Sequence, residues 1–225
     1  MIKLVLFDID GTLVRTGKAG IKAFSQAFAD EFGLNHGSEK LKFAGRTDYS
    51  LVREFFLQHG VTPTSSHFER FFARYLDHLE QVIVQCDGAI IPGVHTFMKE
   101  LRALENAPAI GLLTGNVRRG AEIKLRHFSL WQEFQFGGFA DDHEERDCIA
   151  AIARQRGCDF IGKKLSDDEV LVLGDTPLDV RCARAIGAKV IAVATGGHTR
   201  EDLALHQPDW AVADLNAISA KDICA

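Results

Sequence analysis

A short apolar run near the N-terminus ends on two acidic residues. Residues 4–7 (Leu-Val-Leu-Phe) are followed by Asp8, Asp10 and then Gly11. In a strand, residues i and i+2 point to the same side, so the two carboxylates converge where the strand ends. Burying two anions together is costly unless a cation balances them, and ligands that are all oxygen favour Mg²⁺ over zinc. A turn without catalytic role is the alternative interpretation, because Asp and Gly commonly end strands.

Further apolar runs resemble the first and are separated by helical patterns. They cover residues 109–113, 170–173 and 190–193, with a weaker candidate at 210–212, while residues 94–104 and 150–156 have helical spacing. Alternation of strands and helices predicts an α/β fold with a doubly wound, mainly parallel sheet. In such folds ligands bind at the carboxyl ends of the strands, where Asp8 and Asp10 lie.

Residues 16–90 interrupt this alternation and are predicted to be helical. Apolar residues recur every three or four positions at Ile21, Phe24, Phe28 and Phe32, and similar spacing follows at 51–57 and 68–84. We therefore predict a core formed by residues 1–15 and 91–225, with residues 16–90 as an inserted helical cap. The aromatic residues of this segment are expected to pack as the core of a bundle. The crossings at 14–18 and 89–92 are suited to hinges.

Composition excludes several classes of function. The chain has 225 residues, of which 46% are hydrophobic and 25% charged, with a formal net charge of −5, so nucleic acid is not expected as a partner. Neither a signal peptide nor an apolar stretch of about 18 residues is found, so a membrane partner is not expected either. Five scattered cysteines without a C-x-x-C pair predict neither disulfides nor zinc. We expect a cytoplasmic protein.

The strand ends carry an ordered set of polar motifs. Residues 8–12 read Asp-Ile-Asp-Gly-Thr, residues 114–116 read Thr-Gly-Asn, and residues 174–179 read Gly-Asp-Thr-Pro-Leu-Asp. This set resembles the haloacid dehalogenase-like hydrolase superfamily, in particular the phosphatase branch that includes phosphoglycolate phosphatases and β-phosphoglucomutases and carries a helical cap after the first strand. The resemblance covers essentially the whole chain and implies a Rossmann-like core.

The resemblance also implies roles for the acidic residues. Asp8 is expected to attack phosphorus and become an aspartyl phosphate, while Asp10 protonates the leaving oxygen and then activates water. Mg²⁺ is expected to be held by Asp8, the backbone carbonyl of Asp10 and Asp175, with Asp179 in support. Gly11 and Thr12 complete the turn beneath the phosphate, where glycine permits a tight backbone.

Residues 114–116 are predicted to bind phosphate. The Thr114 hydroxyl and the backbone N–H groups of Gly115 and Asn116 can hold phosphate oxygens at the start of a helix. Thr114 is also a candidate helix N-cap, and the two roles are compatible.

The cation that balances the phosphate is not in the usual place. Many relatives carry a lysine shortly before the fourth motif, whereas residues 141–146 here contain none. Lys124, ten residues after Thr114, matches a sub-branch whose second motif is Thr-Gly-Asn, and we expect it to offset charge beside Asp8. Arg146 is the next candidate and Arg118 a weaker one. An exposed surface lysine is the alternative interpretation of Lys124.

The predicted cap contains a loop, Gly45-Arg46-Thr47-Asp48, of the kind that such caps lower onto the site. Arg46 is expected to reach the substrate, and Thr47 is expected to contact it or to cap the following helix. We therefore assign both residues to substrate binding.

The predicted function is Mg²⁺-dependent hydrolysis of a small phosphorylated metabolite by a monomer or weak dimer. A β-phosphoglucomutase-like phosphotransferase is the main alternative, and a catalytically silent binding module on the same fold is another. A phosphonatase would need a cap lysine where Arg46 stands, and a dehalogenase has no need of Asp10. The intact carboxylates Asp8, Asp10 and Asp175 speak against the silent module.

Overall fold

A six-stranded parallel sheet forms the centre of the protein. The structure is a computed structural model that describes residues 1–224. The strand order is β5-β4-β1-β6-β7-β8, and every neighbouring pair is parallel, so the predicted doubly wound sheet is confirmed. Because β1 lies between β4 and β6, its carboxyl end is flanked by the ends of both. The strands are β1 (Leu4–Phe7), β4 (Ala109–Leu113), β5 (Gly137–Gly138), β6 (Val170–Gly174), β7 (Lys189–Val193) and β8 (Trp210–Val212).

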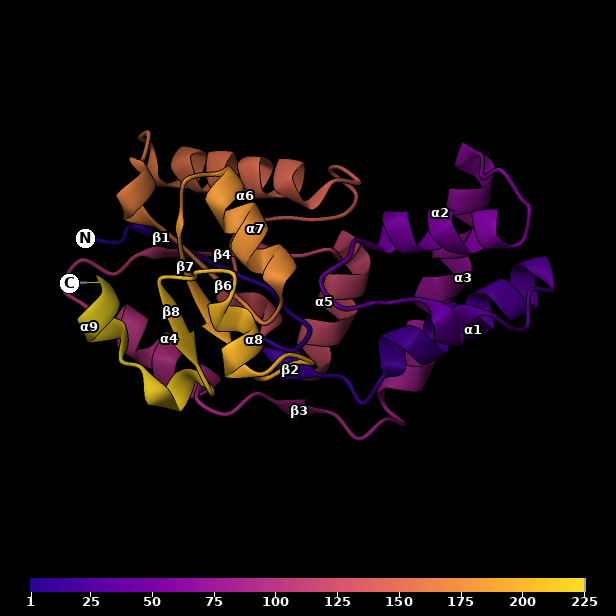
Figure 1. Cartoon of the computed structure of the whole chain (residues 1–225), viewed down its shortest axis with the longest axis horizontal. Helices are drawn as coiled ribbons and strands as arrows, with labels where there is room; N and C mark the ends of the chain where they lie inside the picture. Colours follow the sequence, from indigo (N-terminus) through magenta and orange to yellow (C-terminus); the bar gives the residue numbers. More distant parts are fainter. Residues whose placement is uncertain (225) are drawn as a thin grey trace.

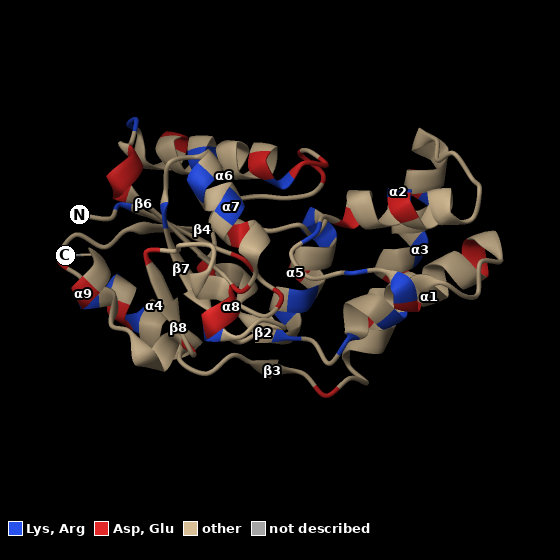
Figure 2. Ribbon diagram, viewed as in Figure 1, with Lys and Arg blue, Asp and Glu red and all other residues tan. Residues whose placement is uncertain are grey.

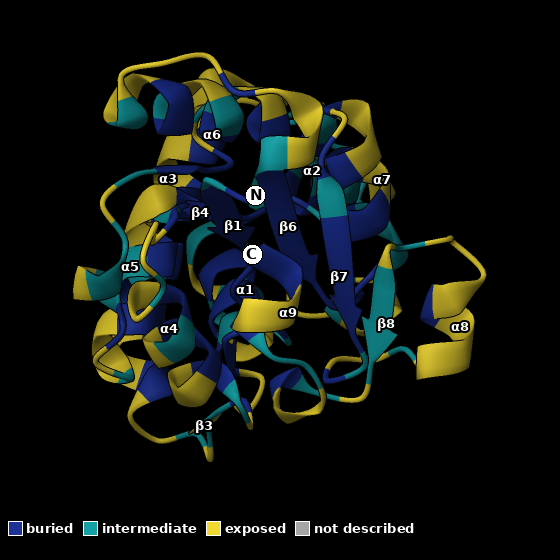
Figure 3. Ribbon diagram, turned by 90° about the vertical axis from the view of Figure 1, so that its left-hand side faces the viewer, coloured by how far each residue is buried: buried dark blue, intermediate teal, exposed yellow. Residues whose placement is uncertain are grey.

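Helices cover both faces of this sheet (Figure 3), and the inner strands are buried between them, whereas the edge strand β8 is half-buried. Alternate residues of β1 face opposite sides, with Leu4 and Leu6 in one apolar cluster and Val5 and Phe7 in the other. The helices on the Phe7 side are α4 (Val94–Arg102), α5 (Arg118–His127) and α9 (Ala220–Cys224), and those on the Leu4 side are α6 (Arg146–Ile161), α7 (Pro177–Ala185) and α8 (Arg200–Ala204). Burial on both faces explains why these strands are continuously apolar.

Three further helices lie together beyond the carboxyl ends of the strands (Figure 1). They are α1 (Ala19–Phe32), α2 (Asp48–Gln58) and α3 (Ser65–Ile83). Phe28 is fully buried between them, with its ring centroid 4.2 Å from that of Phe55 and 4.4 Å from that of Phe71. The aromatic residues of this segment therefore pack as a bundle core, as predicted from their spacing.

The two chain crossings between the helical segment and the sheet pair with each other. Strands β2 (Val14–Arg15) and β3 (Ala89–Ile90) are antiparallel, with Val14 opposite Ile90. These strands and β5 have two residues each, too few to show a period in the sequence. The apolar cluster of the helical segment continues onto α5 through Val117 and Ile123. The division into residues 1–15 with 91–225 and residues 16–90 thus stays a prediction.

Charges of both signs are mixed over the molecule. Figure 2 shows Lys and Arg interspersed with Asp and Glu on the helices around the sheet and on those beyond it. None of the helices within residues 1–224 is long and apolar enough to cross a membrane.

The aromatic cluster provides a test of the fold. Replacing Phe28 by Ala leaves a cavity among several rings, so we expect Phe28→Ala to lower the free energy of unfolding by about 3–5 kcal/mol in urea denaturation. The control is Phe160→Ala, because the Phe160 side chain is 56% exposed and its loss should change the stability little. Equal effects of the two substitutions would contradict this packing.

Candidate active site

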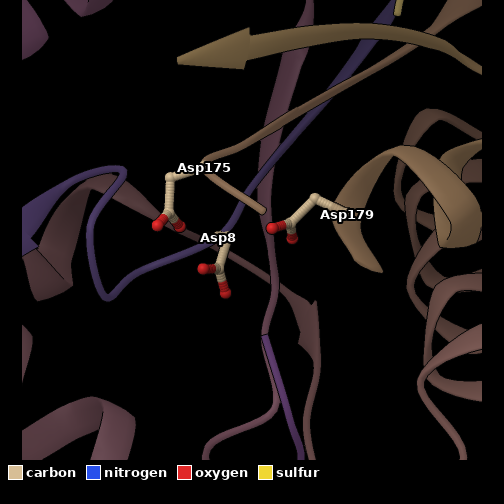
Figure 4. Close-up of side chains that lie close together, drawn as sticks. All are labelled: Asp8, Asp175 and Asp179. Atoms are coloured by element: carbon tan, nitrogen blue, oxygen red, sulfur yellow. The ribbon is translucent and has the colours of Figure 1, made fainter. Parts of the chain in front are cut away.

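Three buried carboxylates meet at the carboxyl ends of β1 and β6 (Figure 4). Asp8 follows β1, Asp175 follows β6, and Asp179 lies in the first turn of α7. Each offers an oxygen within 4.8 Å of the others, and their exposed fractions are 5%, 3% and 0%. The structure therefore brings together the side chains of three of the four predicted metal-binding residues.

The local sequence permits this close approach. Gly11 has φ +87°, which favours glycine, and a Cβ atom there would lie 2.5 Å from Asp175 Oδ2. Thr176 is the N-cap of α7 and holds Asp179 in place, because its Oγ1 donates to Asp179 Oδ2 at 2.6 Å and accepts from Asp179 N. Thr12 is fully buried behind the site, with its hydroxyl 3.4 Å from Asp175 Oδ1.

Arg146 is the cation that contacts this cluster. It begins α6, is 5% exposed, and places Nη2 3.1 Å from Asp8 Oδ1. The same nitrogen forms an ion pair with Asp179, while Nη1 donates to the backbone carbonyl of Gly45 at 2.9 Å. The guanidinium therefore joins the carboxylate cluster to the loop before α2.

The cluster carries more negative charge than Arg146 offsets. Burial, together with the negative charges of Asp179 and Asp10, raises the pKa of Asp8 to about 7, although the charge of Arg146 opposes this shift. Burial, Asp179 and Asp8 likewise raise the pKa of Asp175 well above its ordinary value. Buried carboxylates that repel one another in this way are stabilised by a bound cation. Because all donors are oxygen atoms, the set fits a hard divalent metal ion.

Lys124 is buried and contacts Asp10. Its Nζ lies 2.6 Å from Asp10 Oδ2 and 2.6 Å from Asn116 Oδ1. Asn116 in turn donates from Nδ2 to Asp10 Oδ2 at 2.8 Å. The sequence predicted Lys124 beside Asp8, whereas the structure places Lys124 on Asp10 and Arg146 on Asp8. The alternative that Lys124 is an exposed surface lysine is wrong, since it is only 4% exposed.

Thr114 lies at the end of β4 with its hydroxyl beside Asn116. Asn116 Nδ2 donates to Thr114 Oγ1 at 2.8 Å, which leaves the hydroxyl hydrogen of Thr114 available to a ligand. The N-cap of α5 is Val117, so the interpretation of Thr114 as an N-cap is wrong. Within residues 1–224 the N–H of Gly115 has no hydrogen-bond partner.

The loop Gly45-Arg46-Thr47-Asp48 contacts the core mainly through its backbone and through Thr47 and Asp48. Thr47 caps α2, as predicted, and its hydroxyl donates to the carbonyl of Glu144 at 2.8 Å. Asp48 donates from its N–H to the carbonyl of Gly115 at 2.7 Å and accepts from the N–H of Val117 at 2.8 Å. These bonds hold the loop against the start of α5.

The Arg46 guanidinium, predicted to reach the substrate, is bound to α2. It forms an ion pair with Glu54 and donates to Ser50 Oγ at 3.3 Å. Arg118, the weaker candidate for the balancing cation, lies over the Phe139 ring at 5.6 Å from its centroid.

One cavity of about 550 Å³ joins these groups. Most of the predicted site residues line it, whereas Thr12, Thr47 and Asp179 lie behind its surface. Sequence reasoning did not assign Asp48, Tyr75 or Gly196, which also line it. A signal existed for Gly196, because it follows the apolar run of β7, and for Asp48, because it ends the loop after Gly45.

Comparison with known proteins gives a consistent result. A family model described as haloacid dehalogenase-like hydrolase matches residues 5–193, which confirms the resemblance indicated by the motifs. A phosphoglycolate phosphatase of Synechococcus elongatus is 26% identical, covering 93% of this chain and 92% of its own. One from Rhodospirillum rubrum is 27% identical over 91% and 84% of the two chains. The crystal structure of a hydrolase from Pseudomonas syringae has a TM-score of 0.75, with 20% identity over 98% and 100%, and shares the fold.

The contact between Asp48 and α5 provides a test by pH. Burial raises the pKa of Asp48 from 3.8 to about 6, although Lys124 and the Val117 N–H oppose it. Between these values the folded protein keeps a proton that the unfolded chain has released, so Asp48 lowers the free energy of unfolding as pH rises from about 4 to 6. We expect Asp48→Asn to gain stability relative to the original protein across this window, measured from urea midpoints. A difference that is constant from pH 4 to 7 would argue against this environment for Asp48.

Proposed function

The chain belongs to the haloacid dehalogenase-like hydrolase family, and we propose that it is a Mg²⁺-dependent phosphatase acting on the phosphomonoester of a small metabolite. The observation that carries this proposal is the buried cluster of Asp8, Asp175 and Asp179 beside Arg146, at the carboxyl ends of parallel strands. The names of the phosphoglycolate phosphatases among its relatives support a phosphomonoester as the substrate.

Hydrolysis would proceed in two steps. In the first, an Asp8 oxygen forms a bond to phosphorus while the bond from phosphorus to the leaving oxygen breaks, and Asp10 gives its proton to that oxygen. In the second, Asp10 takes a proton from water, whose oxygen attacks phosphorus and releases phosphate and the free Asp8 carboxylate. Arg146, 3.1 Å from Asp8 Oδ1, would orient the nucleophile and offset the charge of the approaching phosphate.

Metal binding would involve Asp8, Asp175 and the backbone carbonyl of Asp10, with Asp179 in support. The oxygen donors within 4.8 Å and the raised pKa values of Asp8 and Asp175 support this assignment. A bound Mg²⁺ supplies positive charge that offsets the phosphate oxygens during transfer.

Polar groups between β4 and α5, and Lys124 on α5, would act on the phosphate and on Asp10. The free hydrogen of the Thr114 hydroxyl and the N–H of Gly115 are available to phosphate oxygens. Lys124 and Asn116 hold one carboxylate oxygen of Asp10, so we assign to them the orientation of the proton donor. Gly11 permits the turn that brings Asp10 to this position.

Other features of the sequence prediction remain proposals. A β-phosphoglucomutase-like phosphotransferase would use the same first step and differ in the acceptor, which would be a sugar hydroxyl in place of water. A silent binding module would keep the fold without turnover. The cytoplasmic location, the monomer or weak dimer, and the contact of Arg46 and Thr47 with substrate also stay predictions.

The decisive experiment measures phosphate release from a panel of small phosphomonoesters. We expect turnover with Mg²⁺, none in excess chelator, and a loss of at least about 10³-fold in Asp8→Asn, because the amide is not a nucleophile. A beryllofluoride adduct should form on Asp8 in the original protein and not in the variant. Phosphate release that is unchanged in Asp8→Asn would disprove the assignment, and transfer to a sugar without phosphate release would favour the mutase.

The two cations can be separated by the leaving group. Arg146→Ala should lower kcat by about 10²-fold on every substrate, because Arg146 contacts the nucleophile. Lys124→Ala should lower kcat strongly on alkyl phosphates, whose leaving oxygen needs a proton, and less on 4-nitrophenyl phosphate, whose leaving group needs none. The ratio of kcat on alkyl phosphates to kcat on 4-nitrophenyl phosphate therefore shows whether a cation acts through Asp8 or through Asp10. If Lys124→Ala lowered kcat equally for both leaving groups, Lys124 would instead assist the attack by Asp8.

A further inference from the structure

The wall of the active-site cavity that the α1–α3 segment contributes is largely apolar. Ile21 and Phe24 come from α1, Phe43 from the following loop, Leu51 from α2 and Tyr75 from α3, and all of them line the cavity that contains Asp8 and Asp10. A leaving group attached to a phosphate on Asp8 would therefore share this cavity with apolar side chains.

Two of these side chains have apolar surface that the fold does not cover. Ile21 is 38% exposed although it is a large aliphatic residue. Phe43 is half-buried, and its ring packs against that of Phe24 in an edge-to-face arrangement, with the ring centroids 5.2 Å apart. Burial of such surface by a ligand is favourable.

Most cations of the cavity wall are already engaged by protein groups. Arg15 donates to the carbonyl of Thr195 at 2.7 and 3.0 Å, and Arg46 is paired with Glu54. Lys124 and Arg146 are held by the catalytic carboxylates. Lys18 remains, and its side chain is exposed without an ion pair or hydrogen bond to any residue that the structure describes.

The same wall contains an additional acidic group. Asp48 lines the cavity and accepts from the N–H of Val117 at 2.8 Å. A carboxylate on the leaving group would share the cavity with the carboxylates of Asp48 and Asp10, which is unfavourable, and the unpaired Lys18 is exposed to solvent, where ionic attraction is weak. Tyr75 offers a hydroxyl that forms no hydrogen bond within residues 1–224 and can contact a neutral polar atom.

We propose that the substrate is the phosphomonoester of an uncharged, largely apolar alcohol rather than of a hydroxy acid such as glycolate. The inference rests on the proposed phosphatase function and specifies its leaving group. The apolar body packs on Ile21 and Phe43, while the phosphate lies against Asp8, Thr114 and Arg146.

Three phosphate esters that differ in one feature each provide the test. Benzyl phosphate carries a neutral ring, 4-carboxybenzyl phosphate carries the same ring with a carboxylate, and phosphoglycolate carries the carboxylate without the ring. We expect kcat/KM for benzyl phosphate to exceed both others by at least about tenfold, in line with the discrimination of apolar pockets. A preference of the enzyme for either carboxylate ester would overturn the proposal.

Variants locate the effect on the cavity wall. Ile21→Ser, at an exposed position, should raise KM for benzyl phosphate several-fold, and Phe43→Ala by about tenfold, with a smaller effect of both substitutions on KM for phosphoglycolate. The matched control is Val84→Ser, because Val84 is 68% exposed and lies outside this cavity. An equal effect of Ile21→Ser on all three substrates would also overturn the proposal.

Calorimetry separates this inference from the proposed function. Benzylphosphonate and phosphonoacetate are not hydrolysed, so their binding does not depend on turnover. In the presence of Mg²⁺, we expect benzylphosphonate to bind at least about tenfold more tightly than phosphonoacetate. This difference in affinity should be smaller in Ile21→Ser. If none of the three esters released phosphate, the phosphatase function would be disproved. If phosphonoacetate bound more tightly than benzylphosphonate, only the proposal of an apolar leaving group would be disproved.

Discussion

The charge balance of the buried carboxylates is the constraint on which the site depends. Asp8, Asp175 and Asp179 are close together and buried, and within residues 1–224 Arg146 is the cation that contacts them. The raised pKa values of Asp8 and Asp175 express the repulsion between these carboxylates and the cost of burying them. Arg146 reduces the repulsion by contacting both Asp8 and Asp179. The remaining excess of negative charge is what a bound divalent metal ion would offset.

The fold creates this charge density through its topology. Because β1 lies between β4 and β6 in a parallel sheet, the residues that follow these strands lie close together at one edge of the sheet. Even short side chains such as Asp can therefore contact one another there. Gly11 and the cap of α7 by Thr176 then allow carboxylates to approach within contact. The apolar residues of β1 are buried on both faces and fix the strand in register, so the position of Asp8 follows from the packing of residues 4–7.

Sequence patterns predicted the elements better than the contacts between them. The apolar runs gave β1, β4, β6 and β7 because buried parallel strands are continuous in hydrophobicity, and the motif spacing gave the acidic residues at their ends. The partner of Lys124 was not predictable, since distance along a helix fixes the face of a residue and not which of two neighbouring carboxylates it meets. Arg46 likewise depends on Glu54, eight residues later, whose i+8 relation to a loop residue has no local signature.

The loop before α2 shows how the helical segment and the catalytic cluster depend on each other. Arg146 donates from Nη1 to the carbonyl of Gly45 and forms an ion pair with Asp8 through Nη2, so the same rigid guanidinium contacts both the loop and the carboxylate that we propose as the nucleophile. If the loop moved away, a buried N–H would lose its acceptor, and unpaired buried donors are costly. The charges of the buried cluster therefore stabilise the position of the loop, and the loop, together with the apolar wall beside it, bounds the cavity in which we propose that the leaving group lies.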